Sequence, residues 1–263
     1  MSENTLVKKD FYGAMTGLSL GDLRFYPQAG SSNDLALVWA SEGARDLSLV
    51  FADEQTGGRG RLGRRWFTPA GSALAFSLIF RPSEHEREHV GLFAGLGALA
   101  LVDALKARGL LAEIKWPNDV LIGGKKTAGI LVETVWTGAE VDSVVLGMGV
   151  NVFAASVPPA EALNFPATCV ATELGGAQPD RFGLLRSLLE RLVAWRPRLN
   201  SELFLRAWDE ALAYRGQEVR VTLGADELVG RVAGLERDGR LLLDLVDGGM
   251  RAVSAGEVHL RPL

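Results

Sequence analysis

The stretch of sequence that decides the fold is residues 113–152, which read EIKWPNDVLIGGKKTAGILVETVWTGAEVDSVVLGMGVNV. Apolar runs in this stretch, rich in β-branched residues, are separated by short polar or glycine-containing breaks, which is typical of consecutive strands. Gly123 and Gly124 supply a tight hairpin turn between two of these runs. The stretch therefore predicts a β-rich core with strands at 113–116, 119–122, 127–136 and 141–152.

Outside this stretch, the spacing of apolar residues predicts a mixture of helices and strands. Strands are expected at 23–26, 46–52 and 72–80, and helices at 33–43, 82–109, 181–195 and 201–214. Residues 1–21 show no clear period and predict a flexible lead-in, and 154–180 predict an ordered loop with one turn of helix.

The sequence changes character near its C-terminal end. From Gly216 onward the apolar period becomes two, and turns are expected at Asp238-Gly239 and Asp247-Gly248-Gly249. Short strands at this spacing predict a small barrel. We therefore expect a lead-in over 1–22, a main domain over 23–214 and a second domain over 215–263.

The composition favours a globular protein that acts on small molecules. The 263 residues carry a net charge of −4, which argues against general binding of nucleic acid because phosphate neutralisation needs a basic surface. The longest uncharged apolar run, Val90–Val102, is too short for a membrane span. Cys169 has no partner cysteine, which fits a reducing cytoplasm.

Residues 58–66, Gly-Arg-Gly-Arg-Leu-Gly-Arg-Arg-Trp, concentrate positive charge in a chain that is acidic overall. Glycine lets main-chain N–H groups approach a ligand closely, and arginine binds phosphate or carboxylate oxygens. The letters also match the dinucleotide fingerprint, but a strand rather than a helix is expected to follow, so that interpretation is disfavoured. A kinase glycine loop is disfavoured because the other kinase motifs are missing. The segment predicts a loop that closes over a small anion.

His85-Glu86-Arg87-Glu88-His89 matches the His-Glu-x-x-His motif of zinc proteases. A second interpretation is favoured, in which Ser83 and Glu86 form a capping box at the exposed start of a helix. No metal-binding residues are therefore predicted.

Two further motifs indicate a ligand site. Lys115-Trp116-Pro117-Asn118-Asp119 places polar groups at the tip of a strand, and Lys126 returns across the glycine hairpin to the same tip. Gly147 and Gly149 interrupt an apolar strand that ends at Asn151, and glycine in a strand often marks the close approach of another group.

The order of these motifs resembles that of the biotin–protein ligases. Gly-Arg-Gly-Arg-x-Gly-Arg-x-Trp, Lys-Trp-Pro-Asn-Asp, Lys-x-Ala-Gly-Ile-Leu-Val-Glu and Gly-x-Gly-x-Asn-Val occur in sequence, followed near the end by Gly256-Glu257-x-x-Leu260-Arg261. The resemblance covers about residues 23–263. It implies an α+β fold with a mixed β-sheet and flanking helices, related to class II aminoacyl-tRNA synthetases, and a C-terminal SH3-like barrel.

The resemblance also implies an activity. Members of the family make biotinyl-adenylate from biotin and MgATP and then transfer biotin to one lysine of a biotin carboxyl carrier protein. The implied catalytic residues are Lys126, Arg61, Arg59 and Asp119. The implied biotin contacts are Ser31, Ser32, Asn33, Gln55, Gly58, Arg59, Arg61 and Gly129. The implied ATP and adenylate contacts are Arg61, Arg64, Trp66, Lys115, Asn118, Asp119, Lys126, Asn151 and Arg261. Mg²⁺ is expected to bind through the phosphates, and Asp119 is either a base or the residue that orients Lys126.

Two alternatives stay open at this point. A lipoate or octanoyl ligase or transferase would share the catalytic domain, and a non-catalytic sensor would bind biotinyl-adenylate without using it. Only about twenty residues precede the core, so we expect a ligase without the DNA-binding domain of the regulatory members. The sequence does not decide whether the chain forms a homodimer.

Overall fold

The computed structural model describes residues 3–223, 226–246, 248–254 and 258–262. The helices are α1 (Glu3–Met15), α2 (Ser32–Ser41), α3 (Glu84–Glu88), α4 (Phe93–Lys106), α5 (Val170–Glu173), α6 (Arg181–Trp195) and α7 (Glu202–Glu210). The strands of the main sheet are β1 (Leu23–Ala29), β2 (Ser48–Gln55), β3 (Ala73–Phe80), β4 (Ala112–Lys115), β5 (Asp119–Ile122), β6 (Lys125–Thr137) and β7 (Glu140–Asn151). The C-terminal strands are β8 (Glu218–Leu223), β9 (Asp226–Leu235), β10 (Leu241–Leu245), β11 (Met250–Val253) and β12 (Val258–Pro262).

The main sheet is mixed and has the strand order β1-β2-β3-β7-β6-β5-β4. Strands β1 and β2 are parallel, and the remaining neighbours are antiparallel. The predicted hairpin is present between β5 and β6, where Gly123 and Gly124 both have positive φ. Antiparallel pairing brings the end of β7 beside the start of β3 and the start of β6, and this arrangement gathers the sequence motifs at one end of the sheet.

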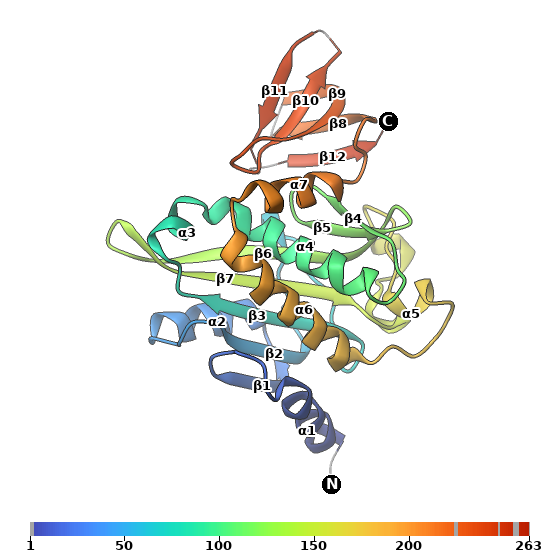
Figure 1. Cartoon of the computed structure of the whole chain (residues 1–263). Coiled ribbons are helices and arrows are strands. Elements are labelled where there is room, and N and C mark those ends of the chain that lie inside the picture. Colours follow the sequence, from blue (N-terminus) through green and yellow to red (C-terminus); the bar gives the residue numbers. More distant parts are fainter. Residues whose placement is uncertain (1–2, 224–225, 247, 255–257, 263) are drawn as a thin grey trace.

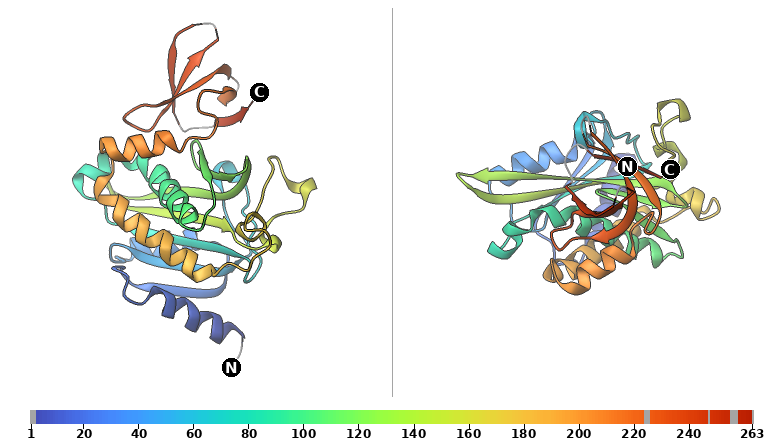
Figure 2. Two further views of the ribbon diagram at one scale, coloured as in Figure 1. Left: turned by 45° about the vertical axis from the view of Figure 1, so that its right-hand side comes forward. Right: turned by 90° about the horizontal axis from the view of Figure 1, so that it is seen from above.

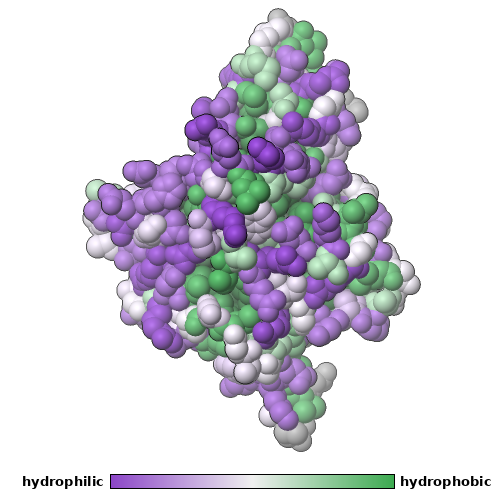
Figure 3. Space-filling view, in the orientation of Figure 1, coloured by the Kyte–Doolittle hydropathy of each residue, from purple (hydrophilic) through white to green (hydrophobic). Residues whose placement is uncertain are grey.

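Helices cover both faces of this sheet (Figures 1 and 2). Helices α4 and α6 pack against each other on one face, and α2 packs on the other face against β2, β3 and β7. Every residue of β3 is buried, as expected for a strand that is covered on both sides. The larger core lies under α4 and α6, and a smaller core lies under α2 around Trp39. The face drawn in Figure 3 mixes hydrophilic and hydrophobic residues, with hydrophilic ones prevalent.

The N-terminal segment differs from the prediction. Residues expected to form a flexible lead-in instead form α1, and Phe11 of this helix is fully buried among Phe25, Phe51 and Phe182. Arg186 of α6 also donates to the carbonyl of Ala14 at 2.8 Å. The apolar residues of α1 are too few to give a clear period, but they meet an aromatic cluster that no local pattern reveals.

The helix predicted over 82–109 is divided in two. Ser83 and Glu86 form the predicted capping box, but the resulting helix α3 ends at Glu88. A 3-10 turn at Val90–Leu92 follows before α4 begins. The C-cap of α3 at His89 has φ −120° and ψ 27°, which breaks the helical path.

The C-terminal strands form a separate antiparallel sheet in the order β11-β10-β9-β8-β12, as the period of two predicts. This sheet lies at the opposite end of the molecule from α1, with α7 between it and the main sheet (Figure 1). Trp116 Nε1 donates to the carbonyl of Gly239 at 2.9 Å and so joins the two parts of the chain. Asp247 of the second predicted turn and the pair Gly256-Glu257 lie outside the described residues.

The described helices include none with the length and apolar character that crossing a bilayer requires. The fold class predicted from the sequence is confirmed, with a mixed sheet, flanking helices and a small C-terminal β-domain.

Candidate active site

The motifs meet at a cavity of about 480 Å³. Its walls come from the arginine loop, the β4–β5 turn, strands β5 and β6, the C-terminal end of β7, the segment 156–167 and β12. Seven positively charged side chains are among the described lining residues, and Asp119 is the only carboxylate among them. The seven are Arg59, Arg61, Arg64, Arg65, Lys115, Lys126 and Arg261. A cavity with this balance of charge favours an anionic ligand.

One end of the cavity is polar but uncharged. The side chain of Gln55 accepts from the Ser32 main-chain N–H at 2.8 Å and donates to Thr68 Oγ1 at 3.2 Å, so its orientation is fixed. Ser77 Oγ lies 2.9 Å from Ser32 Oγ and donates to Asn33 Oδ1 at 2.5 Å. All of these groups except Gln55 are buried. They form a rigid set of donors and acceptors suited to a small polar ring.

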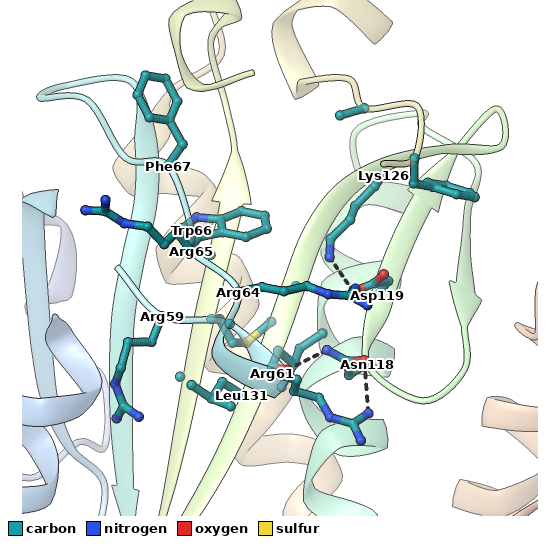
Figure 4. A pocket seen from close by; sticks show the side chains of 18 of the residues that line it. Arg59, Arg61, Arg64, Arg65, Trp66, Phe67, Asn118, Asp119, Lys126 and Leu131 are labelled. Carbon is teal, nitrogen blue, oxygen red and sulfur yellow. Dashed lines mark hydrogen bonds and ion pairs between the residues drawn. The ribbon is translucent and has the colours of Figure 1, made fainter. Parts of the chain in front are cut away.

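The arginine loop folds back on itself. Trp66 N–H donates to the Gly58 carbonyl at 2.8 Å, and Gly60 N–H donates to the Arg64 carbonyl at 2.7 Å. A Cβ on Gly58 would come closer than 3.0 Å to the Trp66 carbonyl, so glycine is required there. Leu62 at the tip has φ 58°, in the left-handed region that non-glycine residues seldom adopt. The turn presents Arg61 and Arg64 toward the hairpin (Figure 4).

The indole of Trp66 lies flat on the glycine-containing strands. A Cβ on Gly149 would overlap the ring, and one on Gly129 would lie 3.2 Å from it. Lys126 Nζ is 5.5 Å from the ring centroid, on the cavity side (Figure 4). The two glycines therefore seat an aromatic platform beside the lysine.

Asp119 lies between two lysines. Lys126 Nζ is 2.6 Å from Asp119 Oδ1, and Lys115 Nζ is 3.7 Å from Oδ2. Burial lowers the pKa of Lys115 from 10.5 to about 8, and the neighbouring Asp119 carboxylate only partly offsets this effect. The carboxylate orients both ammonium groups toward the same part of the cavity.

Arg61 reaches from the arginine loop to the turn between β4 and β5. Its Nη1 donates to Asn118 Oδ1 at 3.3 Å, and the Asn118 amide is fixed by donating to the Ile130 carbonyl at 3.0 Å. Burial lowers the pKa of the Arg61 guanidinium, and the Asp119 carboxylate opposes this shift. A bound anion would therefore replace lost hydration around this group.

The remaining wall connects to the C-terminal domain. Arg261 Nη2 donates to the Asn164 carbonyl at 3.5 Å, and its guanidinium lies 5.2 Å from the Phe165 ring. Lys115 Nζ lies over the same ring at 4.4 Å. Asn151 is buried and donates to the Thr168 carbonyl at 3.1 Å, which fixes the base of the segment that carries Phe165.

The structure brings nearly all the predicted site residues to this cavity. The predicted residues that line it together with the charged set are Ser31, Ser32, Asn33, Gln55, Trp66, Gly129 and Asn151. Gly58 is not among the lining residues and packs against the Trp66 carbonyl within the loop. Arg59 is placed differently from the rest. It points away from Lys126, and its guanidinium pairs with Asp34 at 2.7 Å and Glu133 at 2.6 Å (Figure 4).

Sequence reasoning missed two residues. Glu133 ends the motif that contains Lys126, so its position was visible but its contact with Arg59 was not. Phe165 lies in a loop without a recognisable motif, and only the fold brings it to Lys115.

The His-Glu-x-x-His segment lies away from this cavity. Ligand atoms of His85, Glu88 and His89 are within 4.8 Å of one another. Both ring nitrogens of His89 have partners, however, namely the His85 carbonyl at 2.7 Å and Asn200 Nδ2 at 2.5 Å. A metal ion would have to displace one of these hydrogen bonds. Glu86, the acid of the motif, is instead paired with Arg196 at 2.7 Å.

Comparison with known proteins places this fold in a class of protein ligases. Residues 27–151 match the biotin/lipoate A/B protein ligase family, and residues 215–261 match the biotin protein ligase C-terminal domain. The biotin--[acetyl-CoA-carboxylase] ligase of Mycobacterium tuberculosis is 37% identical over 247 residues, covering 89% of this chain and 87% of the relative. The corresponding ligase of Paracoccus denitrificans is 37% identical and is covered over 96% of its length. The chain belongs to the biotin protein ligase family.

Solved structures agree with this assignment. The biotin protein ligase from Aquifex aeolicus in complex with biotin and ATP superposes with a TM-score of 0.79 and 28% identity, covering 92% of this chain and 99% of that one. The Bacillus subtilis bifunctional ligase/repressor BirA is 30% identical over 93% of this chain and 76% of its own length.

Proposed function

We propose that this protein is a biotin–protein ligase that converts biotin and ATP to biotinyl-5′-AMP and then transfers biotin to a specific lysine of a carrier protein. One observation carries the proposal. The cavity joins a rigid, polar pocket around Ser32 and Gln55 to a region lined by several cations that include Arg61 and Lys126, and biotin has a polar ring and a carboxylate at its opposite ends. The family membership and the biotin- and ATP-bound relative support the same assignment.

In the first step the biotin carboxylate attacks the α-phosphate of ATP. Two unit charges about 4 Å apart repel by about 4 kcal/mol at an effective dielectric near 20. Arg61 and Lys126 face the region between the two ends of the cavity and are placed to offset this repulsion. One preorganised donor is worth about 3 kcal/mol of transition-state stabilisation.

Asp119 acts in this scheme as a positioning residue. Its two oxygens are directed to Lys126 and Lys115, so it orients both lysines in the cavity. Both carboxylate oxygens already face a lysine, which favours this orienting role over accepting a proton from the carrier lysine.

The nucleotide would occupy the end of the cavity formed by Trp66, Asn118, Asn151 and Arg261. Trp66 offers a flat surface to an adenine ring, and Lys115, Arg64 and Arg261 face the phosphate region. At the other end, Ser31, Ser32, Asn33 and Gln55 would bind the ring of biotin, and Gly129 would allow its chain to pass close to β6.

The residues of this cavity fit Mg²⁺ that is bound mainly to the phosphates of ATP. Asp119, the only carboxylate among the described lining residues, is already paired with lysines. The ion would therefore bind chiefly through phosphate oxygens and water, as it commonly does in nucleotide sites. It would neutralise phosphate charge during attack.

The proposed acceptor is the carrier domain of a biotin-dependent carboxylase, as the names of the two ligase relatives suggest. We also propose a cytoplasmic location, because the lone cysteine fits a reducing compartment. A homodimer is compatible with this function.

The direct test mixes the purified protein with biotin, MgATP and an apo carrier domain. We expect a mass increase of one biotin on one carrier lysine. Lys126→Met should abolish transfer, whereas Cys169→Ser should leave it unchanged, because the thiol is buried and lies 3.1 Å from Thr172 Oγ1, outside the cavity. Modification by lipoate or octanoate in place of biotin would support the alternative ligase. Adenylate binding without transfer would support the sensor.

A further inference from the structure

Glu133 of β6 connects the arginine loop to the polar end of the cavity. Its Oε2 accepts from Arg59 Nη2 at 2.6 Å and from Asn33 Nδ2 at 2.9 Å, and its Oε1 accepts from Arg59 Nη1 at 3.0 Å. The same carboxylate therefore holds a side chain of the loop and a buried side chain of the pocket.

The contacts continue inward from Asn33. Because its amide nitrogen faces Glu133, its oxygen is the atom that accepts from Ser77 at 2.5 Å. A hydroxyl has one proton to donate, so when Ser77 donates to Asn33, the Ser32 hydroxyl 2.9 Å away donates to Ser77. Ser32 Oγ is then left with lone pairs for a ligand N–H.

The direction of these hydrogen bonds is fixed among the buried residues, whereas the partly exposed Glu133 and Arg59 can adjust. Ser32, Asn33 and Ser77 are each at least 95% buried, so an unmatched donor among them would be costly. Gly147 also lies against Asn33, because a Cβ there would overlap the amide. The side chains of Glu133 and Arg59 are 27% and 38% exposed and so have room to move.

We propose that Glu133 is a positioning residue that couples occupancy of the ring pocket to the conformation of the loop 58–65. A ligand N–H that engages Ser32 extends the hydrogen-bond order that runs from Ser32 to Glu133, and the carboxylate at the outer end of this order holds Arg59 and the base of the loop. This inference deepens the proposed function and rests on it, because the ligand at Ser32 is taken to be biotin.

The substitution Glu133→Gln tests the coupling with little change of shape. A glutamine offers one oxygen, so its NH₂ must face either Arg59 or Asn33, both of which are donors. Glu140→Gln is the matched control, because Glu140 is also on the β6–β7 hairpin and also pairs with an arginine, Arg87, but is far from the cavity. Asp34→Asn removes a second partner of Arg59 without touching Asn33.

Calorimetry would measure the dissociation constant of the ATP analogue AMPCPP with and without saturating biotin. We expect biotin to tighten AMPCPP binding by about tenfold in the wild-type protein and in Glu140→Gln, within the usual range for coupled sites. In Glu133→Gln this factor should fall below about twofold, with each ligand still binding alone. Asp34→Asn should retain most of it.

Full coupling in Glu133→Gln would overturn the proposal, and so would wild-type protein that binds both ligands without coupling. Absence of biotin binding to the wild-type protein would instead contradict the proposed function. Hydrogen exchange provides a readout that needs no ligand. Amides of residues 58–66 should exchange faster in Glu133→Gln than in Glu140→Gln, and equal exchange would overturn the proposal.

Discussion

Gly147 and Gly149 of β7 each make room for one side chain of the cavity. A Cβ on Gly147 would come closer than 3.0 Å to the amide of Asn33, and a Cβ on Gly149 would overlap the ring of Trp66. The residues lie two apart on a strand, so both face the same side of the sheet. Each glycine therefore seats one side chain of one subsite.

Gly147→Ala and Gly149→Ala should consequently weaken the binding of different ligands. We expect Gly147→Ala to weaken biotin by about tenfold or more with little effect on AMPCPP, and Gly149→Ala to weaken AMPCPP preferentially. Calorimetry with each ligand alone measures both effects. Gly13→Ala, which meets open space in α1, serves as the control. Equal weakening of both ligands by both variants would contradict the division into subsites.

We expect Lys115 to make nucleotide binding depend on pH. Its pKa is lowered to about 8 by burial, so it loses its charge near that pH. The protonated form attracts phosphate, and the affinity for AMPCPP should therefore decline as the pH rises above about 8, by at most about tenfold per unit. Binding of phosphate raises the pKa of Lys115, so the decline begins near the pKa of the free protein and levels off above the pKa of the complex.

The matched variant for this prediction is Lys115→Arg, because guanidinium stays charged through this range. Its affinity for AMPCPP should stay nearly constant between pH 7 and 9.5 in calorimetric titrations. An identical decline in the variant and in the wild-type protein would show that another group titrates.

Among the elements, the loop 58–65 is expected to close over the bound ligands. Its tip is a 3-10 turn with Leu62 in the left-handed region, and Arg61 connects that tip to Asn118. Closure over a mixed anhydride would exclude water and retain the intermediate.

Arg61→Ala should accordingly release biotinyl-adenylate. We expect the release rate to rise by about tenfold or more, since a hydrogen bond to a charged group is lost. Rapid filtration of protein loaded with labelled adenylate gives the rate. Arg45→Ala, which removes a surface pair with Asp22, is the control. Unchanged retention and an unchanged rate of synthesis would count against the role of Arg61.

Elements with strong local patterns were predictable. The hairpin strands β5 and β6 follow from apolar runs and two glycines, and α6 follows from its helical spacing. The break between α3 and α4 was not predictable, because it depends on the backbone at His89, and the nearby Gly91 does not have positive φ. Site residues within motifs were brought together as expected, but the direction of the Arg59 side chain depends on Asp34 and Glu133 from other elements.

For the molecule as a whole, α1 is part of the folded core. Its residue Phe11 is completely buried against rings from β1, β2 and α6. Phe11→Ala should lower the free energy of unfolding by about 3–5 kcal/mol, as is typical for a buried aromatic residue. Urea denaturation measures this change. Leu6→Ala, at a position that is 44% exposed, should cost less than about 1 kcal/mol. Equal effects would show that α1 is not anchored through Phe11.

The C-terminal domain also takes part in the site. Trp116 of the β4–β5 turn is bonded to Gly239, and Arg261 of β12 lines the cavity. The two parts of the chain therefore build between them the end of the cavity that is proposed to bind the nucleotide.

The proposed function requires that this cavity joins biotin to the α-phosphate of ATP. Native mass spectrometry of the protein mixed with biotin and MgATP, without a carrier, tests this reaction most directly. We expect one biotinyl-adenylate per chain and release of pyrophosphate, with neither in Lys126→Met. Protein that carries only the unreacted substrates, or that releases phosphate and ADP instead, would contradict it.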